Sequence, residues 1–376
     1  MVAMSLAPLV GEIRSDLNLS RGQIGLALGT WQFVYIATSP MAGRVIERLG
    51  VGFSLTLGAL IVAISGIARS FANDLTTLCL AVALFGVGGP LVSACAPTAV
   101  GLWFTNDRER RFAVGAYTTA PAFGGIAVLV LSNSVLMPIT NSWRWTMVLE
   151  TAVIVLALFF WLLIIRFAPE APKHHVPEKL EKYAHWKTII KHKDVKIIFI
   201  LGVAVFFLSH GLGSWMPEIL REKVGFSSMA ASNWTAGGTG IGILASLILP
   251  SRTLRRTLPV MLLFIFLILA TSLAVMVFSS TAMTPIFVMS AGLRSALIPL
   301  VILALMESPA LNTQNMGKAY GLWFASAEIG GVLGPVLSGQ IADSTFGYDG
   351  VLWMMVLACF MMSLLTYSLR NVYKFE

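Results

Sequence analysis

Eleven long apolar runs constrain the fold of this chain more than any other feature of its sequence. A helix that crosses the hydrocarbon core of a bilayer needs about 20 predominantly apolar residues. Runs of about this length cover residues 22–43, 51–71, 76–104, 112–136, 145–167, 196–216, 228–250, 258–279, 282–306, 316–341 and 350–369. Only 12% of the residues are charged, against about 25% in soluble proteins. The sequence therefore predicts an all-α, polytopic membrane protein.

The first ten residues are apolar but too few to cross a bilayer. At 1.5 Å per residue they would span about 15 Å, which is half the hydrocarbon thickness. Glu12, Arg14 and Asp16 follow as a predicted polar loop. The segment has neither the basic region nor the small-residue cleavage site of a signal peptide. We expect the chain to begin inside its first helix, with an upstream start that completes twelve helices.

Lysine and arginine residues are distributed unequally between successive loops. Of the 26, nineteen lie in one set of alternate loops and Arg294 lies inside an apolar run. The other set of loops holds six: Arg14, Arg21, Arg69, Arg144, Arg221 and Lys223. Because cytoplasmic loops carry the excess of positive charge, we expect the richer side and both termini to be cytoplasmic, in a prokaryotic inner membrane. Dispersed charge of this kind argues against a nucleic-acid partner, and we expect a monomer surrounded by lipid.

A single long polar segment divides the chain. Residues 168–195 form a predicted cytoplasmic loop between an N-terminal bundle, residues 1–167, and a C-terminal bundle, residues 196–376. The sequence GAYTTAPAFGG, which begins at Gly115, is echoed 206 residues later by GLWFASAEIGG, which begins at Gly321. Such an echo is expected of a duplicated transporter whose two bundles move about a site near the midplane of the membrane.

Over essentially its whole length the chain resembles the major facilitator superfamily. The loop GRVIERLG and its second-half counterpart PSRTLRR match the gating motif of that family, with Ser251 where the second copy should have its acid. The matching residues are Gly43, Glu47, Arg48, Gly50, Arg252, Arg255 and Arg256. The resemblance implies two six-helix bundles related by a pseudo-two-fold axis, the first helix being truncated in this chain.

Glycine and proline in helices 5 and 11 extend the resemblance. They are expected to let helices approach closely, and the residues concerned are Pro121, Gly124, Gly125, Gly330, Gly331, Gly334 and Pro335. The arginine that many proton-coupled members carry in helix 4 is absent, since Ala81 or Val82 stands there. WFTNDRERRFAVG, NSWRWTMVLE and GSWMPEIL look like sequences of the cyanate, nitrate and organic-anion porter branches.

Two charged residues lie within the apolar runs of helices 10 and 11, which line the cavity in this family. A charge at the centre of a membrane helix costs about 2.5–3.5 kcal/mol and needs a partner, water or a ligand. The guanidinium of Arg294 can bind a substrate carboxylate through two hydrogen bonds, or it can form a structural or gating ion pair with Glu328. Glu328 is accordingly either a proton-coupling residue or the static partner of Arg294, because burial favours the neutral acid and arginine the ionised form.

Further candidates are less specific. His210, in helix 7, can exchange protons near neutral pH and assist binding or coupling, but a lone histidine is more often a packing residue. Four aromatic residues are predicted to offer substrate-binding surface or simply to pack: Trp31, Tyr35, Tyr117 and Trp323. If they converge, they could instead hold an organic cation by cation–π attraction. Glu150 is read as an interfacial anchor of helix 6.

The chemistry of the sequence favours gradient-driven transport. It has no GxxxxGKS/T, HExxH or GxSxG motif, so we expect neither enzymatic activity nor a catalytic residue, and no cofactor or metal. The function expected is proton-coupled secondary transport of a small organic anion by alternating access. The alternatives are a polyspecific exporter of cationic or amphipathic compounds, in which Glu328 would matter more than Arg294, and a transport-inactive sensor on the same fold.

Overall fold

The computed structural model describes residues 1–104, 106–167, 191–278, 283–311 and 313–369. These residues form helices and short connections, with no strand among them. The chain divides into two compact units, Met1–Lys179 and Leu180–Glu376. The predicted loop between the bundles lies mostly outside the described residues, at 168–190.

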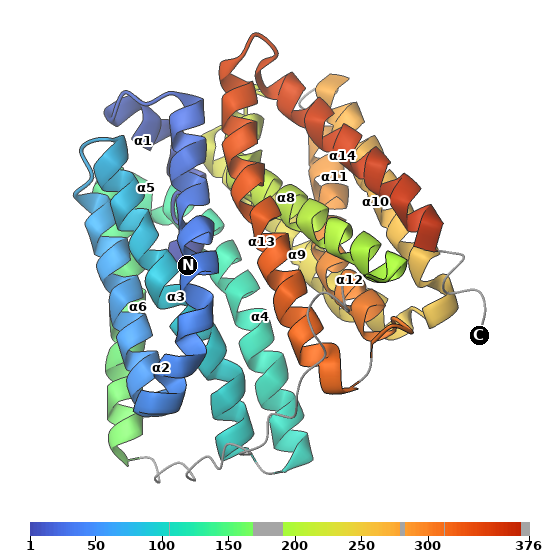
Figure 1. The fold of residues 1–376 in the computed structure, drawn as a ribbon. Coiled ribbons are helices and arrows are strands. Elements are labelled where there is room, and N and C mark those ends of the chain that lie inside the picture. The colour runs from blue at the N-terminus through green and yellow to red at the C-terminus, as the bar shows by residue number, and fades with distance from the viewer. Residues whose placement is uncertain (105, 168–190, 279–282, 312, 370–376) are drawn as a thin grey trace. The chain divides into compact units, whose positions relative to one another are not determined.

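Unit 1 is built around a long, bent helix. Its elements are η1 (Val2–Met4), η2 (Ala7–Leu9), α1 (Val10–Asp16), α2 (Arg21–Ser70), α3 (Leu75–Trp103), α4 (Asp107–Leu131), η3 (Ser132–Leu136), α5 (Met137–Thr140) and α6 (Trp143–Phe167). Both α3 and α6 pack against α2, and these helices can be followed in Figure 1. The polar loop expected at residues 12–16 is wrong in one respect, because α1 continues to Asp16 and buries Ile13.

Helix α2 contains two of the predicted membrane spans. They meet at Gly50, whose φ of 78° and ψ of 163° are not helical. This region of backbone space is essentially restricted to glycine. No other group lies within 4 Å of the position where a Cβ on Gly50 would be. The glycine is therefore required by the backbone angle of the turn rather than by crowding.

Unit 2 contains α8 (Lys193–Glu222), α9 (Ser228–Arg252), η4 (Arg255–Thr257), α10 (Leu258–Phe278), α11 (Thr284–Ala291), η5 (Gly292–Ala296), α12 (Leu297–Met306), α13 (Thr313–Asp343) and α14 (Gly347–Leu369). Helix α8 packs against α13, and α10 packs against α14 (Figure 1). The predicted start of helix 7 at residue 196 is late, since α8 begins at Lys193 and Asp194 is already buried.

Eight described helical segments are long and apolar enough to cross a membrane. One of them is α2, which holds two spans. Helices α9 and α13 are also long, with 25 and 31 residues, but glycine, serine and other polar residues make them less apolar. Helix α6 leaves large apolar side chains such as Phe159, Phe160 and Phe167 exposed, which is the surface expected of a helix that faces lipid. The eight segments, with α2 counted as two spans, and the helices α9 and α13 together account for the eleven predicted runs.

A seam of glycines lets α8 and α13 approach closely. A Cβ on Gly330 would overlap the carbonyl oxygen of Val203, and a Cβ on Gly211 would lie 3.3 Å from the carbonyl oxygen of Gly334. Indole hydrogen bonds span the same seam: Trp323 Nε1 donates to the Ile198 carbonyl oxygen at 3.2 Å. The backbones are thus in contact where side chains would normally separate them.

Candidate functional site

Arg294 lies where its membrane helix changes its winding. The span predicted at residues 282–306 is interrupted by η5, five residues of 3₁₀-helix between α11 and α12. Arg294 is 7% exposed. Its Nη1 donates to the Ala291 carbonyl oxygen at 3.1 Å, the one hydrogen bond that this side chain makes to a described residue. A short 3₁₀ stretch within a helix often marks a hinge or a functional site, and here it places a guanidinium with spare donors.

Small residues of α9 bring that helix against η5. A Cβ on Gly292 would overlap the carbonyl oxygen of Gly238, and a Cβ on Gly242 would lie 2.5 Å from the Gly292 carbonyl oxygen and from Ser295 Oγ. Gly238 and Gly242 are four residues apart and so lie on one face of α9. This close backbone contact holds η5 in place and fixes the direction from which Arg294 leaves the helix.

Glu328 is buried in α13, and it forms no ion pair with another described residue. It is 4% exposed, and its Oε2 has no hydrogen-bond partner among the described residues. The ion pair with Arg294, considered above as a structural alternative, is not formed: within the described parts of unit 2, no ion pair of 4 Å or less joins these two residues. Arg294 of η5 and Glu328 of α13 are therefore each available to interact with another group.

His210 and Trp323 lie at the packing face of α8 and α13. His210 is half-buried, with its ring centroid 5.6 Å from that of Phe206. Trp323 is fully buried, and the same Phe206 ring meets it edge-on at 5.9 Å. Gly202 makes room for the indole, because a Cβ there would overlap Trp323 Nε1. In this structure Trp323 joins two helices, so a role in binding substrate remains a prediction.

Two aromatic candidates of unit 1, Trp31 and Tyr35, line the contact between α2 and α3. Trp31 meets Phe85 edge-on at 5.2 Å, and Tyr35 Oη lies 2.6 Å from Ser93 Oγ. Tyr117 is half-buried on α4.

The glycine and proline residues predicted to let helices approach closely lie in α4 and α13. On α4, Pro121 is exposed, while Gly124 faces the N-terminal segment and Gly125 is buried. In unit 2 the counterparts Gly331, Gly334 and Pro335 are buried in α13.

The second copy of the gating motif has an acidic partner that the sequence comparison missed. In the first copy Gly43, Glu47 and Arg48 are exposed, and Arg252 and Arg256 are exposed in the second. Arg255 Nε, however, lies 3.9 Å from Glu307 Oε2. Glu307 follows α12, about 50 residues beyond the motif, and the neighbouring Ser308 donates a hydrogen bond to Asp194 of α8. The acid missing at Ser251 is thus supplied by another connection.

Two buried charges of unit 1 were assigned wrongly from the sequence. Arg69 was counted among loop residues, yet it is 0% exposed, and Glu150, read as an interfacial anchor, is 1% exposed. Both lie near the ends of helices, where the side-chain direction rather than the position in sequence decides burial. The feature of the sequence that could have indicated burial was the apolar sequence on either side of each charged residue.

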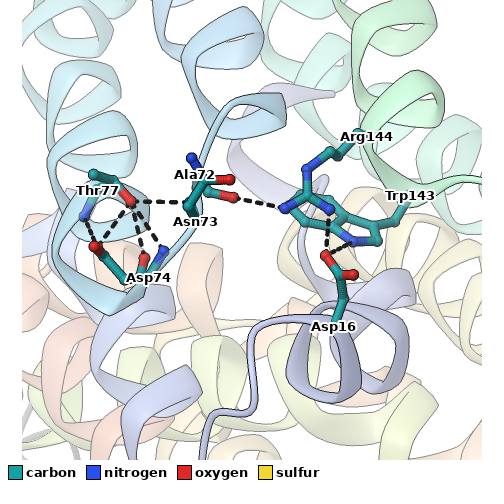
Figure 2. Close-up of polar contacts among 7 residues, drawn as sticks. All are labelled: Asp16, Ala72, Asn73, Asp74, Thr77, Trp143 and Arg144. Carbon is teal, nitrogen blue, oxygen red and sulfur yellow. Dashed lines mark hydrogen bonds and ion pairs between the residues drawn. The ribbon is translucent and has the colours of Figure 1, made fainter.

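In unit 1, Asp16 and Arg144 together join three segments, as Figure 2 shows. Its Oδ2 accepts hydrogen bonds from Arg144 and, at 3.1 Å, from Trp143 Nε1. Arg144 also donates to the Ala72 carbonyl oxygen at 2.9 Å. These two hydrogen bonds lower the pKa of Asp16, and the bond from Arg144 has the larger effect. Nearby, Asp74 caps α3 by accepting from the Thr77 backbone N–H at 2.8 Å.

No group of three or more histidine, cysteine, aspartate or glutamate residues in the described part of the chain is arranged to hold a metal ion. Cys79, Cys95 and Cys359 are free thiols.

Comparison with known proteins identifies relatives among transporters. The profile described as Major Facilitator Superfamily matches residues 1–317. The hexuronate transporter of Bacillus subtilis is 23% identical over 364 residues, covering 90% of this chain and 83% of the relative. Multidrug resistance protein 1 of the same organism is 22% identical over 354 residues, covering 91% and 86%. The uncharacterized transporter YycB of Bacillus subtilis is 24% identical over 218 residues, 58% of this chain and about half, 52%, of the relative.

Solved structures share the fold. A bacterial homologue of the lysosomal transporter spinster, in an inward-facing and unoccupied conformation, superposes with a TM-score of 0.76 at 17% identity, covering 99% of this chain and 94% of that one. A D-xylose-proton symporter gives 0.75 at 15% identity, covering 99% and 95%.

Proposed function

Because this chain belongs to the major facilitator superfamily of integral membrane transporters, we propose that it moves a small, carboxylate-like organic anion by alternating access, with proton transport coupled to it. No catalytic step and no cofactor are involved. The substrate and protons are its small partners, lipid surrounds it, and it works as a monomer in a prokaryotic inner membrane with both termini in the cytoplasm.

The observation that carries the proposal is the state of Arg294. A buried guanidinium is costly unless its donors are used, and among the described residues this side chain makes a single hydrogen bond, to its own helix turn. Its planar fork matches the two oxygens of a carboxylate. A bound anion would supply both the missing charge and the missing acceptors. His210 is proposed to assist, and Trp31, Tyr35, Tyr117 and Trp323 to provide apolar surface.

Glu328 is proposed to couple transport to protons. A carboxyl group enclosed without a counter-charge is stable when protonated, and it can ionise when water or a cation reaches it. Because Arg294 and Glu328 do not pair in this structure, anion binding and proton binding can occur at different residues. Arg48 of the first gating motif and Arg255 with Glu307 of the second are proposed to stabilise one of the alternating conformations.

The relatives support an anion but keep an alternative open. One relative is named for hexuronate, an organic anion, and another for multidrug resistance. The second name favours the alternative function, an exporter of cationic or amphipathic compounds. In that case Glu328 would bind the substrate and Arg294 would be dispensable.

Ligand-induced thermal stabilisation of the purified protein tests the anion proposal. A ligand that binds the folded state raises its Tm. We expect small carboxylates to raise the Tm of the wild type and of R166Q, which removes an exposed arginine at the end of α6, and not that of R294Q. Stabilisation by organic cations that is lost in E328Q and kept in R294Q would instead establish the exporter.

Proton coupling is tested separately in proteoliposomes. We expect E328Q to retain exchange of the identified anion across the membrane but to lose accumulation driven by a pH gradient. If E328Q still accumulates the anion when a pH gradient is imposed, Glu328 does not couple protons, whatever the result for Arg294.

A further inference from the structure

A second buried polar cluster lies in unit 1, far in sequence from Arg294. It consists of Arg69 near the end of α2, Glu150 of α6 and Ser132, the first residue of the π-helical segment η3. These three residues are 0%, 1% and 0% exposed. A π-helical turn within a membrane helix often occurs at a functional site, and here it carries a side chain that touches the buried acid.

Counting hydrogens at Ser132 indicates the protonation state of Glu150. Ser132 Oγ lies 2.5 Å from the Val128 carbonyl oxygen and 2.5 Å from Glu150 Oε1. The serine hydroxyl has a single hydrogen, whereas an ionised carboxylate and a carbonyl can only accept. One hydrogen cannot make two short, linear bonds. Both contacts are satisfied if Ser132 donates to Val128 and the protonated carboxyl group of Glu150 donates to Ser132.

The arrangement around Arg69 agrees with a neutral Glu150. Arg69 Nη1 donates to the Val2 carbonyl oxygen at 2.5 Å and to Ser5 Oγ at 2.9 Å. Its Nε and Nη2, and Glu150 Oε2, have no hydrogen-bond partner among the described residues. The two side chains lie close enough to interact electrostatically. Within the described part of unit 1, however, they form no ion pair of 4 Å or less, although a full carboxylate would be drawn to the free donors.

We propose that Glu150 is a proton-binding site, occupied in this structure, and that Arg69 is the counter-charge of its empty state. When the proton leaves the carboxyl group for water, Ser132 can donate to only one of its two acceptors. The free Nε and Nη2 of Arg69 then supply the hydrogen bonds that the carboxylate needs. The ligand of the site is the proton itself, and the switch is between a neutral acid and an ion pair.

Among the described residues, few charged groups surround the site. Arg69 comes from α2 and the amino group of Met1 from the N-terminal segment. The segments η3 and α5, which also pack against α6, contain no charged residue. Because Ser132 begins the π-helical turn, loss of the proton also changes the hydrogen bonding where α4 passes into η3. The site is independent of Glu328 and of the identity of the substrate.

Infrared spectroscopy of the purified full chain in lipid bilayers tests the proposal directly. A protonated carboxyl group has a C=O stretching band that a carboxylate lacks. We expect the wild type to show such a band from Glu150 at neutral pH. The band should appear in the difference between spectra recorded at neutral pH and at a higher pH that ionises the acid. The band should be missing in E150Q and unchanged in E109Q, which alters an exposed glutamate at the start of α4.

Two further variants keep the test decisive if E150Q does not fold. S132A removes the acceptor of the acid hydrogen bond, so the C=O band should move to higher frequency. R69Q removes the positive charge that favours the ionised form, so the band should persist to higher pH than in the wild type. If neither E150Q nor S132A changes the acid C=O region, Glu150 is ionised and the proposal is wrong. An unchanged titration in R69Q overturns the role of Arg69.

Discussion

Asp16 shows how a single exposed side chain makes the stability of unit 1 depend on pH. Hydrogen bonds from Arg144 and Trp143 lower its pKa. A group whose pKa is lower in the folded state stabilises the fold above its ordinary pKa, and this contribution is lost as the pH falls through the folded-state value. The carboxylate is 45% exposed, so the effect should be below about 1 kcal/mol.

We therefore expect D16N to lower the Tm at neutral pH and to match the wild type in acid. Thermal melts at a series of pH values measure this difference. E109Q, at an exposed position of α4, should follow the wild type throughout. A D16N deficit that persists undiminished at low pH would show that Asp16 acts by geometry rather than by charge.

At the scale of single residues, the sequence identified unusual charged residues better than it predicted the burial and the partners of each charged residue. Arg294 and Glu328 stood out because each interrupts an apolar run, and both are buried. Arg69 and Glu150 were misplaced because each lies near a helix end, where the sequence does not tell whether a long side chain turns toward solvent or into the bundle. Glu307 was missed because its partner Arg255 is distant in sequence, and only the fold brings them together.

Helix α13 allows the importance of backbone contact to be measured with a matched pair. A Cβ on Gly330 would overlap the Val203 carbonyl oxygen, whereas nothing lies within 4 Å of a Cβ on Gly321 in the same helix. Forcing extra atoms into a packed interface costs about 1–3 kcal/mol. We expect G330A to lower the Tm and the yield of folded protein, and G321A to preserve both. Equal behaviour of the two variants would show that α8 can move aside.

At the scale of elements the apolar runs predicted where helices lie but not how they are wound. Each run became a helix or part of one, since a backbone in lipid must satisfy its own hydrogen bonds. The π-helical η3 and the 3₁₀-helical η5 left no trace in the apolar pattern, because both remain helical and apolar overall. The turn within α2 was predictable, since Gly50 separates two runs.

At the scale of the whole molecule, the proposed orientation can be tested by labelling. Single cysteines introduced at exposed Glu109 and Asp349 should lie on opposite sides of the membrane if the distribution of lysine and arginine sets the topology. In intact cells a membrane-impermeant maleimide should label D349C and not E109C, and cell lysis should expose E109C. The unmodified protein serves as the control for Cys79, Cys95 and Cys359. Labelling in the reverse pattern would place both termini outside the cytoplasm.

The winding of η5 has a geometric consequence for Arg294. A 3₁₀-helix turns about 120° and rises about 2.0 Å per residue, whereas an α-helix turns about 100° and rises about 1.5 Å. If the five residues of η5 rewound as α-helix, the helix would shorten by about 2.5 Å and α12 would rotate by about 100° relative to α11. The glycine contact with α9 fixes the backbone at Gly292, so the rotation would move the residues that follow Gly292 in the chain. A change of winding in five residues is thus enough to point the guanidinium in a new direction while both flanking helices stay intact.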